Sequence, residues 1–214
     1  MSLKTLLFPP RCLLCREVQQ AEHEDGLCGS CRALMQAECR RHLHRGMDSV
    51  WVVSAAGYGG AVRSALLRIK SGAVVAAAAP MGELLTAALR EQLPEFRPDL
   101  VTFVPSSALR SRTRGFTLSE EMAKVVAQRL GVPCRPTLQH ALLSAKQAGL
   151  RGEQRSGNAA KSFALRPGIR LVGQKVLLVD DVVASGATIN TCAKLLRQTG
   201  AAEIVGLVFA QSEK

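Results

Sequence analysis

Two adjacent carboxylates, Asp180 and Asp181, follow an apolar run near the C-terminal end of the sequence, in the segment KVLLVDDVVASGATIN (residues 175–190). The apolar run predicts a buried strand, and the residues after Gly186 predict a helix. In an open α/β sheet, ligands bind beyond the carboxyl ends of the strands, which is where the two acids would lie. Their position therefore predicts a ligand site.

The turn between the predicted strand and helix has the features of a phosphate-binding loop. The first N–H groups of a helix have no partner within the helix, and the helix dipole adds positive charge there. Gly186 would let the backbone approach an anion closely, while Ser185 and Thr188 can donate hydroxyl hydrogen bonds.

The two carboxylates would repel a phosphate at close range, but they can accept hydrogen bonds from a diol or bind it through a divalent cation. A ribose that carries a 5′-phosphate offers both groups. The alternative is an ordinary strand-to-helix turn in which an aspartate caps the helix. That alternative accounts for one acid better than for two in tandem.

Four cysteines near the N-terminus form the pattern C-x2-C-x12-C-x2-C, made by Cys12 with Cys15 and by Cys28 with Cys31. Each pair has the spacing at which two thiolates from one tight turn bind the same zinc ion, and two pairs complete a closed tetrahedral site. A disulfide and a redox-active C-x-x-C pair are the alternatives. A reducing cytosol disfavours the first, and the lack of a flanking βαβ pattern disfavours the second. We therefore expect a structural Zn²⁺ that supplies most of the folding free energy of a small module.

The elements that position these residues alternate along the rest of the chain. Apolar runs predict strands at residues 49–58, 99–105, 175–179 and 203–210, and helical periodicity predicts helices at 61–70, 81–93, 118–130 and 187–199. Thr117 and Glu120 form a capping box for the third helix. This alternation predicts an α/β domain with a mostly parallel sheet flanked by helices on both faces.

We expect residues 1–46 to form the four-cysteine zinc-finger module and a basic linker, and residues 47–214 to form the α/β domain. A polar, weakly patterned stretch at residues 136–168 carries several lysines and arginines. So long a connection inside a compact domain is usually functional, and we expect a flexible loop that acts as a lid.

The composition favours polyanionic partners. The chain has 28 Lys and Arg against 17 Asp and Glu, which gives a formal net charge of +11. Such a surface attracts nucleic acid or phosphorylated small molecules, and a basic surface kept for solubility is the alternative. Only 4% of residues are aromatic, so contacts with single-stranded DNA should depend on the phosphate backbone more than on base stacking.

No apolar run is long enough to cross a bilayer, and the N-terminus lacks a convincing secretory signal. We therefore expect a cytoplasmic protein that is not an integral membrane protein.

The segment around Asp180 resembles the phosphoribosyl pyrophosphate (PRPP) motif of type I phosphoribosyltransferases. The resemblance implies that Asp180 and Asp181 are catalytic residues that hold the ribose hydroxyls of PRPP bound with Mg²⁺. It implies that the 5′-phosphate is wrapped by the next segment, namely Val183, Ala184, Ser185, Gly186, Ala187 and Thr188. Members usually carry hydroxyl residues at both positions before the glycine, and here one of these is Ala184.

Taken whole, the chain resembles the competence protein F (ComF) family, which joins an N-terminal zinc finger to a phosphoribosyltransferase-like domain. The resemblance is carried by the four cysteines, RIKSG, VPSSALRSRTRGF, KQAGLRGEQRSGNAAKSF and the PRPP motif. Thr117 stands where members usually have asparagine. The resemblance implies contacts with pyrophosphate or DNA phosphates from four basic residues: Arg114, Arg110, Lys70 and Arg155. For each arginine, the alternative is a solvated surface charge. For Lys70, the alternative is a cation that interacts favourably with the dipole at the C-terminal end of a helix.

The resemblance implies a competence accessory protein that helps to bring single-stranded DNA into the bacterial cytoplasm, near the inner face of the membrane. Its implied partners are a DNA-uptake helicase, a channel and recombination mediator proteins. A second hypothesis is a catalytically active phosphoribosyltransferase whose acceptor the sequence does not name. A third is an adaptor that acts only through its zinc finger.

Overall fold

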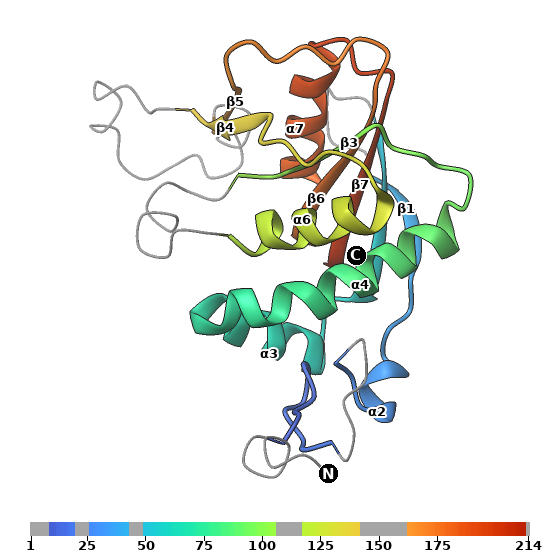
Figure 1. The fold of residues 1–214 in the computed structure, drawn as a ribbon, viewed down its shortest axis with the longest axis vertical. Coiled ribbons are helices and arrows are strands. Elements are labelled where there is room, and N and C mark those ends of the chain that lie inside the picture. The colour runs from blue at the N-terminus through green and yellow to red at the C-terminus, as the bar shows by residue number, and fades with distance from the viewer. Residues whose placement is uncertain (1–8, 20–25, 43–48, 106–116, 142–161, 213–214) are drawn as a thin grey trace.

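The computed structural model describes residues 9–19, 26–42, 49–105, 117–141 and 162–212 (Figure 1). Within them, a five-stranded sheet has the order β1-β2-β7-β6-β3. Its strands are β1 (Glu38–His42), β2 (Val50–Gly57), β7 (Glu203–Gln211), β6 (Lys175–Val183) and β3 (Leu100–Phe103). β1 is antiparallel to β2, and the other neighbours are parallel. The predicted mostly parallel sheet is confirmed.

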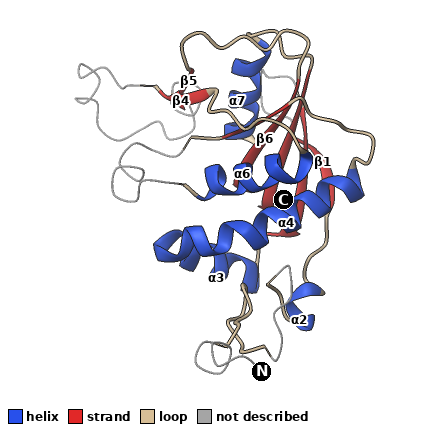
Figure 2. Cartoon of the chain, viewed as in Figure 1, coloured by secondary structure: helices blue, strands red, loops and turns tan. Residues whose placement is uncertain are grey.

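Helices cover both faces of this sheet, because its strands are apolar on both sides. In β6, Leu177 and Val179 belong to one buried cluster, while Val176 and Leu178 belong to another. The first cluster lies under α3 (Gly60–Arg68), α4 (Val74–Gln92) and α6 (Leu118–Leu130), and the second under α7 (Ala187–Arg197). Figure 2 shows α4 and α6 running across the front of the strands. Every residue of β7 except Glu203 is buried, as expected for a parallel strand that is covered on both faces.

The third predicted helix has the predicted start. The Thr117 side chain accepts a hydrogen bond from the Glu120 N–H at 3.2 Å, and Gly131 ends the helix in the left-handed conformation with φ 70°. The second predicted helix is longer than expected. It begins at Val74 as α4 and contains Pro80. A π-helical turn, η1 (Ile69–Ala73), joins it to α3.

The segment that we predicted to be a basic linker contains β1, which is paired along its whole length with β2. The predicted flexible loop also begins and ends in ordered structure. Its two ends form a short antiparallel pair, β4 (Leu138–His140) with β5 (Phe163–Leu165), while residues 142–161 lie outside the described part of the chain. Whether this segment acts as a lid stays a prediction.

The four-cysteine segment packs directly against the α/β domain. Leu14 and Leu27, at 1% and 0% exposure, belong to the same buried cluster as Leu66 and Met81 of α3 and α4. Gly26 also lies against Pro80 of α4, because a Cβ at Gly26 would come within 3.3 Å of the proline ring. The module therefore shares a core with the domain, and the predicted boundary at residue 46 separates parts that are packed together.

None of the helices in the described ranges combines the length and the apolar character that a membrane span requires.

Candidate functional site: an acid pair, a phosphate-type loop and a four-cysteine cluster

The acid pair lies within the ladder of the sheet. β6 continues through Asp180 and Asp181 to Val183, and Asp180 is in register with Val208 of β7. The Asp180 Oδ1 atom accepts two hydrogen bonds, one from the Ser119 hydroxyl of α6 at 3.0 Å and one from the Asp181 N–H at 2.8 Å. The neighbouring helix and the backbone thus hold the Asp180 carboxylate in one orientation.

Lys70 is the basic residue that the structure places beside the acids. Its Nζ atom lies 2.8 Å from Asp181 Oδ2, with side-chain exposures of 37% for the lysine and 20% for the aspartate. Lys70 stands in η1, so the π-helical turn brings a cation to the carboxyl end of β6. π-Helical turns inside α-helical segments are frequent at functional sites. The contact of Lys70 with a ligand phosphate stays a prediction.

Asp180 holds its proton unusually well. Burial and the negative charge of Asp181 raise the pKa of Asp180 to about 7, although the hydrogen bonds from Asp181 and Ser119 and the charge of Lys70 oppose the shift. A carboxyl group with a pKa near neutrality can change its charge when a cation or ligand arrives. Such shifts are typical of functional sites.

This shift gives a pH prediction. The unfolded chain binds a proton at Asp180 only below about pH 4, whereas the folded chain keeps it to about pH 7. The protonated acid therefore favours folding below pH 4, and this contribution is lost as the pH rises through 7. We expect wild type to lose stability relative to Asp180→Asn by about 1 kcal/mol per pH unit between pH 5 and 7. Urea unfolding of both proteins at several pH values measures the difference. A constant difference would contradict the raised pKa.

The loop after β6 has the geometry of a phosphate-binding turn. Gly186 is the N-cap residue of α7 with φ 76°, a conformation that favours glycine, and it has no side chain to cap the helix. The Ala187 N–H makes one long hydrogen bond to the Ser185 hydroxyl oxygen at 3.4 Å. Ala184 and Ser185 are exposed, while Ala187 and Thr188 are partly buried and Val183 is buried. Asn190 holds the turn from within, because its side-chain amide donates to the Gly186 carbonyl at 2.9 Å. The loop thus offers N–H groups and hydroxyls beside the acid pair.

Three of the four predicted basic contacts lie outside the described residues, namely Arg110, Arg114 and Arg155. The ends of the segment that holds the first two are described. The Val104 N–H donates to the Val179 carbonyl of β6 at 2.9 Å, and Ser119 contacts Asp180 just after the segment. The described residues on either side of this segment therefore lie beside β6.

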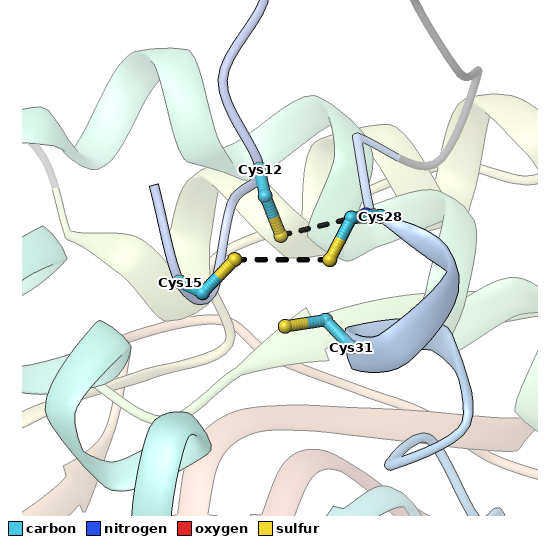
Figure 3. A group of neighbouring side chains, drawn as sticks. All are labelled: Cys12, Cys15, Cys28 and Cys31. Atoms are coloured by element: carbon cyan, nitrogen blue, oxygen red, sulfur yellow. Dashed lines mark hydrogen bonds between the residues drawn. The ribbon is translucent and has the colours of Figure 1, made fainter. Parts of the chain in front are cut away.

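The four predicted zinc ligands come together. The Sγ atoms of Cys12, Cys15, Cys28 and Cys31 all lie within 4.8 Å of one another (Figure 3). The Cys15 and Cys28 sulfurs are 3.7 Å apart. Four thiolates at Zn–S distances of about 2.3 Å in a tetrahedron would be about 3.8 Å apart, so the cluster fits one zinc ion.

The backbone of the cluster also suits thiolates. The Cys28 N–H donates to Cys12 Sγ at 3.5 Å. Burial opposes a charge on Cys12, but N–H groups of Cys28, Cys15 and Leu14 outweigh it and lower the pKa of Cys12 to about 6. Burial and the neighbouring thiols raise the pKa of Cys31. A cation in the cluster would offset the repulsion between the neighbouring thiolates, so the donor set fits structural zinc.

Comparisons with known proteins agree with both parts of the chain. The phosphoribosyl transferase domain family matches residues 113–212, and the double zinc ribbon domain family matches residues 3–43. The DNA utilization protein YhgH of Salmonella typhi is 32% identical over 108 residues, which are 50% of this chain and 47% of that protein. Competence protein F of Haemophilus influenzae is 28% identical over 109 residues, 50% of this chain and 48% of that protein. Over about half of its length, the chain is therefore similar to competence protein F.

The recognised family resemblance and the predicted fold class are therefore confirmed, with a type I phosphoribosyltransferase-like domain behind a zinc ribbon. The chain covers about half the length of these two relatives. An adenine phosphoribosyltransferase of Desulforamulus reducens is also similar, with 46% identity over 48 residues, 22% of this chain and 27% of that protein.

Two side chains of the site were not singled out from the sequence. Ser119 is the second residue of α6, and the sequence around it indicates only the helix cap at Thr117. Nothing in the local sequence indicates that the Ser119 hydroxyl reaches Asp180. Asn190 could have been suspected, because asparagine is uncommon on the buried side of an amphipathic helix.

Proposed function

We propose that this chain is a ComF-type competence accessory protein that binds PRPP with Mg²⁺ and supports the uptake of single-stranded DNA in bacterial transformation. The observation that carries the proposal is the position of Asp180 and Asp181 at the carboxyl end of a parallel strand, shortly before a helix start at which Gly186 has the left-handed conformation. A homologue named competence protein F supports the biological role.

In this proposal, the acid pair accepts hydrogen bonds from the ribose hydroxyls and faces the Mg²⁺ that accompanies PRPP. The backbone N–H groups and hydroxyls of residues 183–188 bind the 5′-phosphate. Lys70 supplies positive charge near the acids, and Arg110, Arg114 and Arg155 contribute further cations from their loops. The partly buried Asp180 would lose its proton more readily beside the Mg²⁺ complex, because a nearby cation favours the charged carboxylate.

The net charge of +11 supports binding of single-stranded DNA through its phosphates. We expect weak affinity without sequence preference, which falls about tenfold or more between 50 and 200 mM salt, because each phosphate contact releases counterions. Fluorescence anisotropy with a labelled oligonucleotide across that salt range measures the slope. An affinity that is constant with salt would contradict backbone binding.

The test of the proposed function is genetic and biochemical together. A deletion strain complemented with Asp180→Ala/Asp181→Ala should show a much lower transformation frequency than the strain with wild type, while the purified variant keeps its zinc. Glu203→Ala is a matched control, because Glu203 is an acid at the opposite end of the sheet, paired with Lys175. Transformation that is equal in all strains would overturn the PRPP-dependent role and favour an adaptor that acts through its zinc ribbon.

A second candidate function is catalytic phosphoribosyl transfer, which the local similarity to an adenine phosphoribosyltransferase favours. In that reaction, a nitrogen nucleophile of the acceptor displaces pyrophosphate from the anomeric carbon, and the leaving group takes both bonding electrons. The acid pair would fix the ribose, and Lys70 with Mg²⁺ would neutralise the leaving group. Pyrophosphate release from PRPP with a panel of purines, pyrimidines and amines tests this function, and no release with any of them would remove it.

A further inference from the structure

Arg68 connects the last turn of α3 to the zinc ribbon. Its Nη2 atom donates to the carbonyl oxygens of Leu13 at 2.9 Å and Leu14 at 3.0 Å. These two residues lie between Cys12 and Cys15, so the guanidinium holds the turn that presents the first pair of zinc ligands. Hydrogen bonds from a charged donor are stronger than those between neutral groups.

Two residues later, Lys70 makes the ion pair with Asp181 at 2.8 Å. Ile69 stands between the two basic residues and is 3% exposed, in the same buried cluster as Leu14 and Leu27 of the ribbon. The Ser71 hydroxyl donates to the Arg68 carbonyl at 2.6 Å, which closes the turn on itself. One short, packed segment therefore contacts the zinc ribbon at one end and the acid pair at the other.

We infer that Arg68 is a positioning residue for the PRPP site, and that through Lys70 it couples occupancy of the four-cysteine zinc site to the affinity for PRPP with Mg²⁺. This inference rests on the proposed binding of PRPP. The four cysteines fit zinc by the spacing of their sulfurs, and a bound ion would hold in place the turn whose carbonyl groups Arg68 contacts.

The direction of the coupling follows from the charges. Without the ion, the thiolates separate and the Leu13 and Leu14 carbonyls move away from Arg68. The segment then loses the hydrogen bonds that hold it to the ribbon. Lys70 moves away from Asp181, and its positive charge no longer offsets the repulsion between the two acids and the anionic ligand. Coupling between two sites typically changes affinity by about 5- to 150-fold. By reciprocity, PRPP with Mg²⁺ raises the affinity for zinc by the same factor.

The experiment uses the zinc-loaded full chain and the variants Arg68→Met, Lys70→Met and the double variant. Arg63→Met is the matched control, because Arg63 is an exposed arginine of the same helix. Calorimetry gives the Kd for PRPP with Mg²⁺, and a chromogenic chelator gives the rate of zinc release. We expect Arg68→Met to raise the Kd about tenfold and to speed zinc release, with no effect from Arg63→Met.

The double variant separates positioning from general loss of structure. If Arg68 acts through Lys70, Arg68→Met should raise the Kd in wild type but not in the Lys70→Met background. Equal effects of Arg68→Met in both backgrounds would overturn the inference, as would faster zinc release with an unchanged Kd.

The failure of the proposed function has a different signature. If wild type does not bind PRPP at all, the proposed function falls. The link between the sites is then tested by zinc release alone. Lys70→Met should accelerate release about fivefold, although the ion pair of Lys70 is with Asp181 and not with the zinc ribbon. Unchanged release in Lys70→Met would overturn the link.

Discussion

Removal of zinc should destabilise the whole chain and not only its N-terminal segment. Cys12 and Cys31 are 0% and 4% exposed and belong to the same buried cluster as α3, α4 and α6. Structural zinc contributes about 10 kcal/mol to the folding of small zinc modules. If zinc removal lowers the free energy of unfolding of the shared core by half of this amount, about 5 kcal/mol, the melting temperature of a domain of this size falls by about 10–20 °C.

Differential scanning calorimetry before and after treatment with a strong chelator measures this effect, and Cys12→Ser should reproduce it. Cys134→Ser is the control, because Cys134 is a half-buried thiol that packs against the same buried cluster but does not belong to the four-cysteine group. It should leave the zinc content unchanged and lower the melting temperature far less than zinc removal does. Loss of zinc with an unchanged melting temperature would show that the ribbon folds independently of the domain.

The groups that the structure brings together as predicted are those that are contiguous in the sequence. The acid pair, the turn and the start of α7 occupy one run of residues, and each cysteine pair lies within four positions. Local spacing is enough to place such groups together, since a tight turn or a strand end allows few arrangements. The structure brings the four sulfurs together as the pattern predicts.

Contacts between distant segments could not be predicted in this way. Ser119 and Asp180 are 61 positions apart, and Arg68 meets the ribbon across 54 and 55 positions. No periodicity in either segment encodes the pairing, because the tertiary packing of α3 and α6 creates it. The same reason explains why the ribbon looked like a separate module, since Leu14 and Leu27 show their burial against α3 and α4 only in the folded chain.

The observed bounds of two elements differ from the predicted ones. The strand was expected to end at the two acids, but β6 continues to Val183 because backbone groups pair with β7 whatever the side chain. The second helix was predicted to begin at residue 81, yet α4 begins seven residues earlier at Val74, directly after the π-helical turn, and contains Pro80.

The substitution Asp180→Ala/Asp181→Ala should abolish measurable binding of PRPP with Mg²⁺. A hydrogen bond to a charged group contributes about 1.5–3 kcal/mol, so the loss of one such bond at each carboxylate costs about 3–6 kcal/mol. This corresponds to a Kd raised by about 100- to 10,000-fold. Calorimetry at fixed Mg²⁺ measures the change, and Glu203→Ala should keep the wild-type Kd.

The fold should survive this double substitution, and its stability should rise at neutral pH. In the empty site, two adjacent carboxylates repel each other and one of them is largely withdrawn from water, which is why the pKa of Asp180 is raised to about 7. Removing both acids relieves this cost at pH 8, although Lys70 and Ser119 lose their partners. A higher melting temperature together with lost PRPP binding would indicate that the two acids serve ligand binding and lower the stability of the fold. A variant that unfolds, or one that binds PRPP with the wild-type Kd, would show instead that the acids serve the fold.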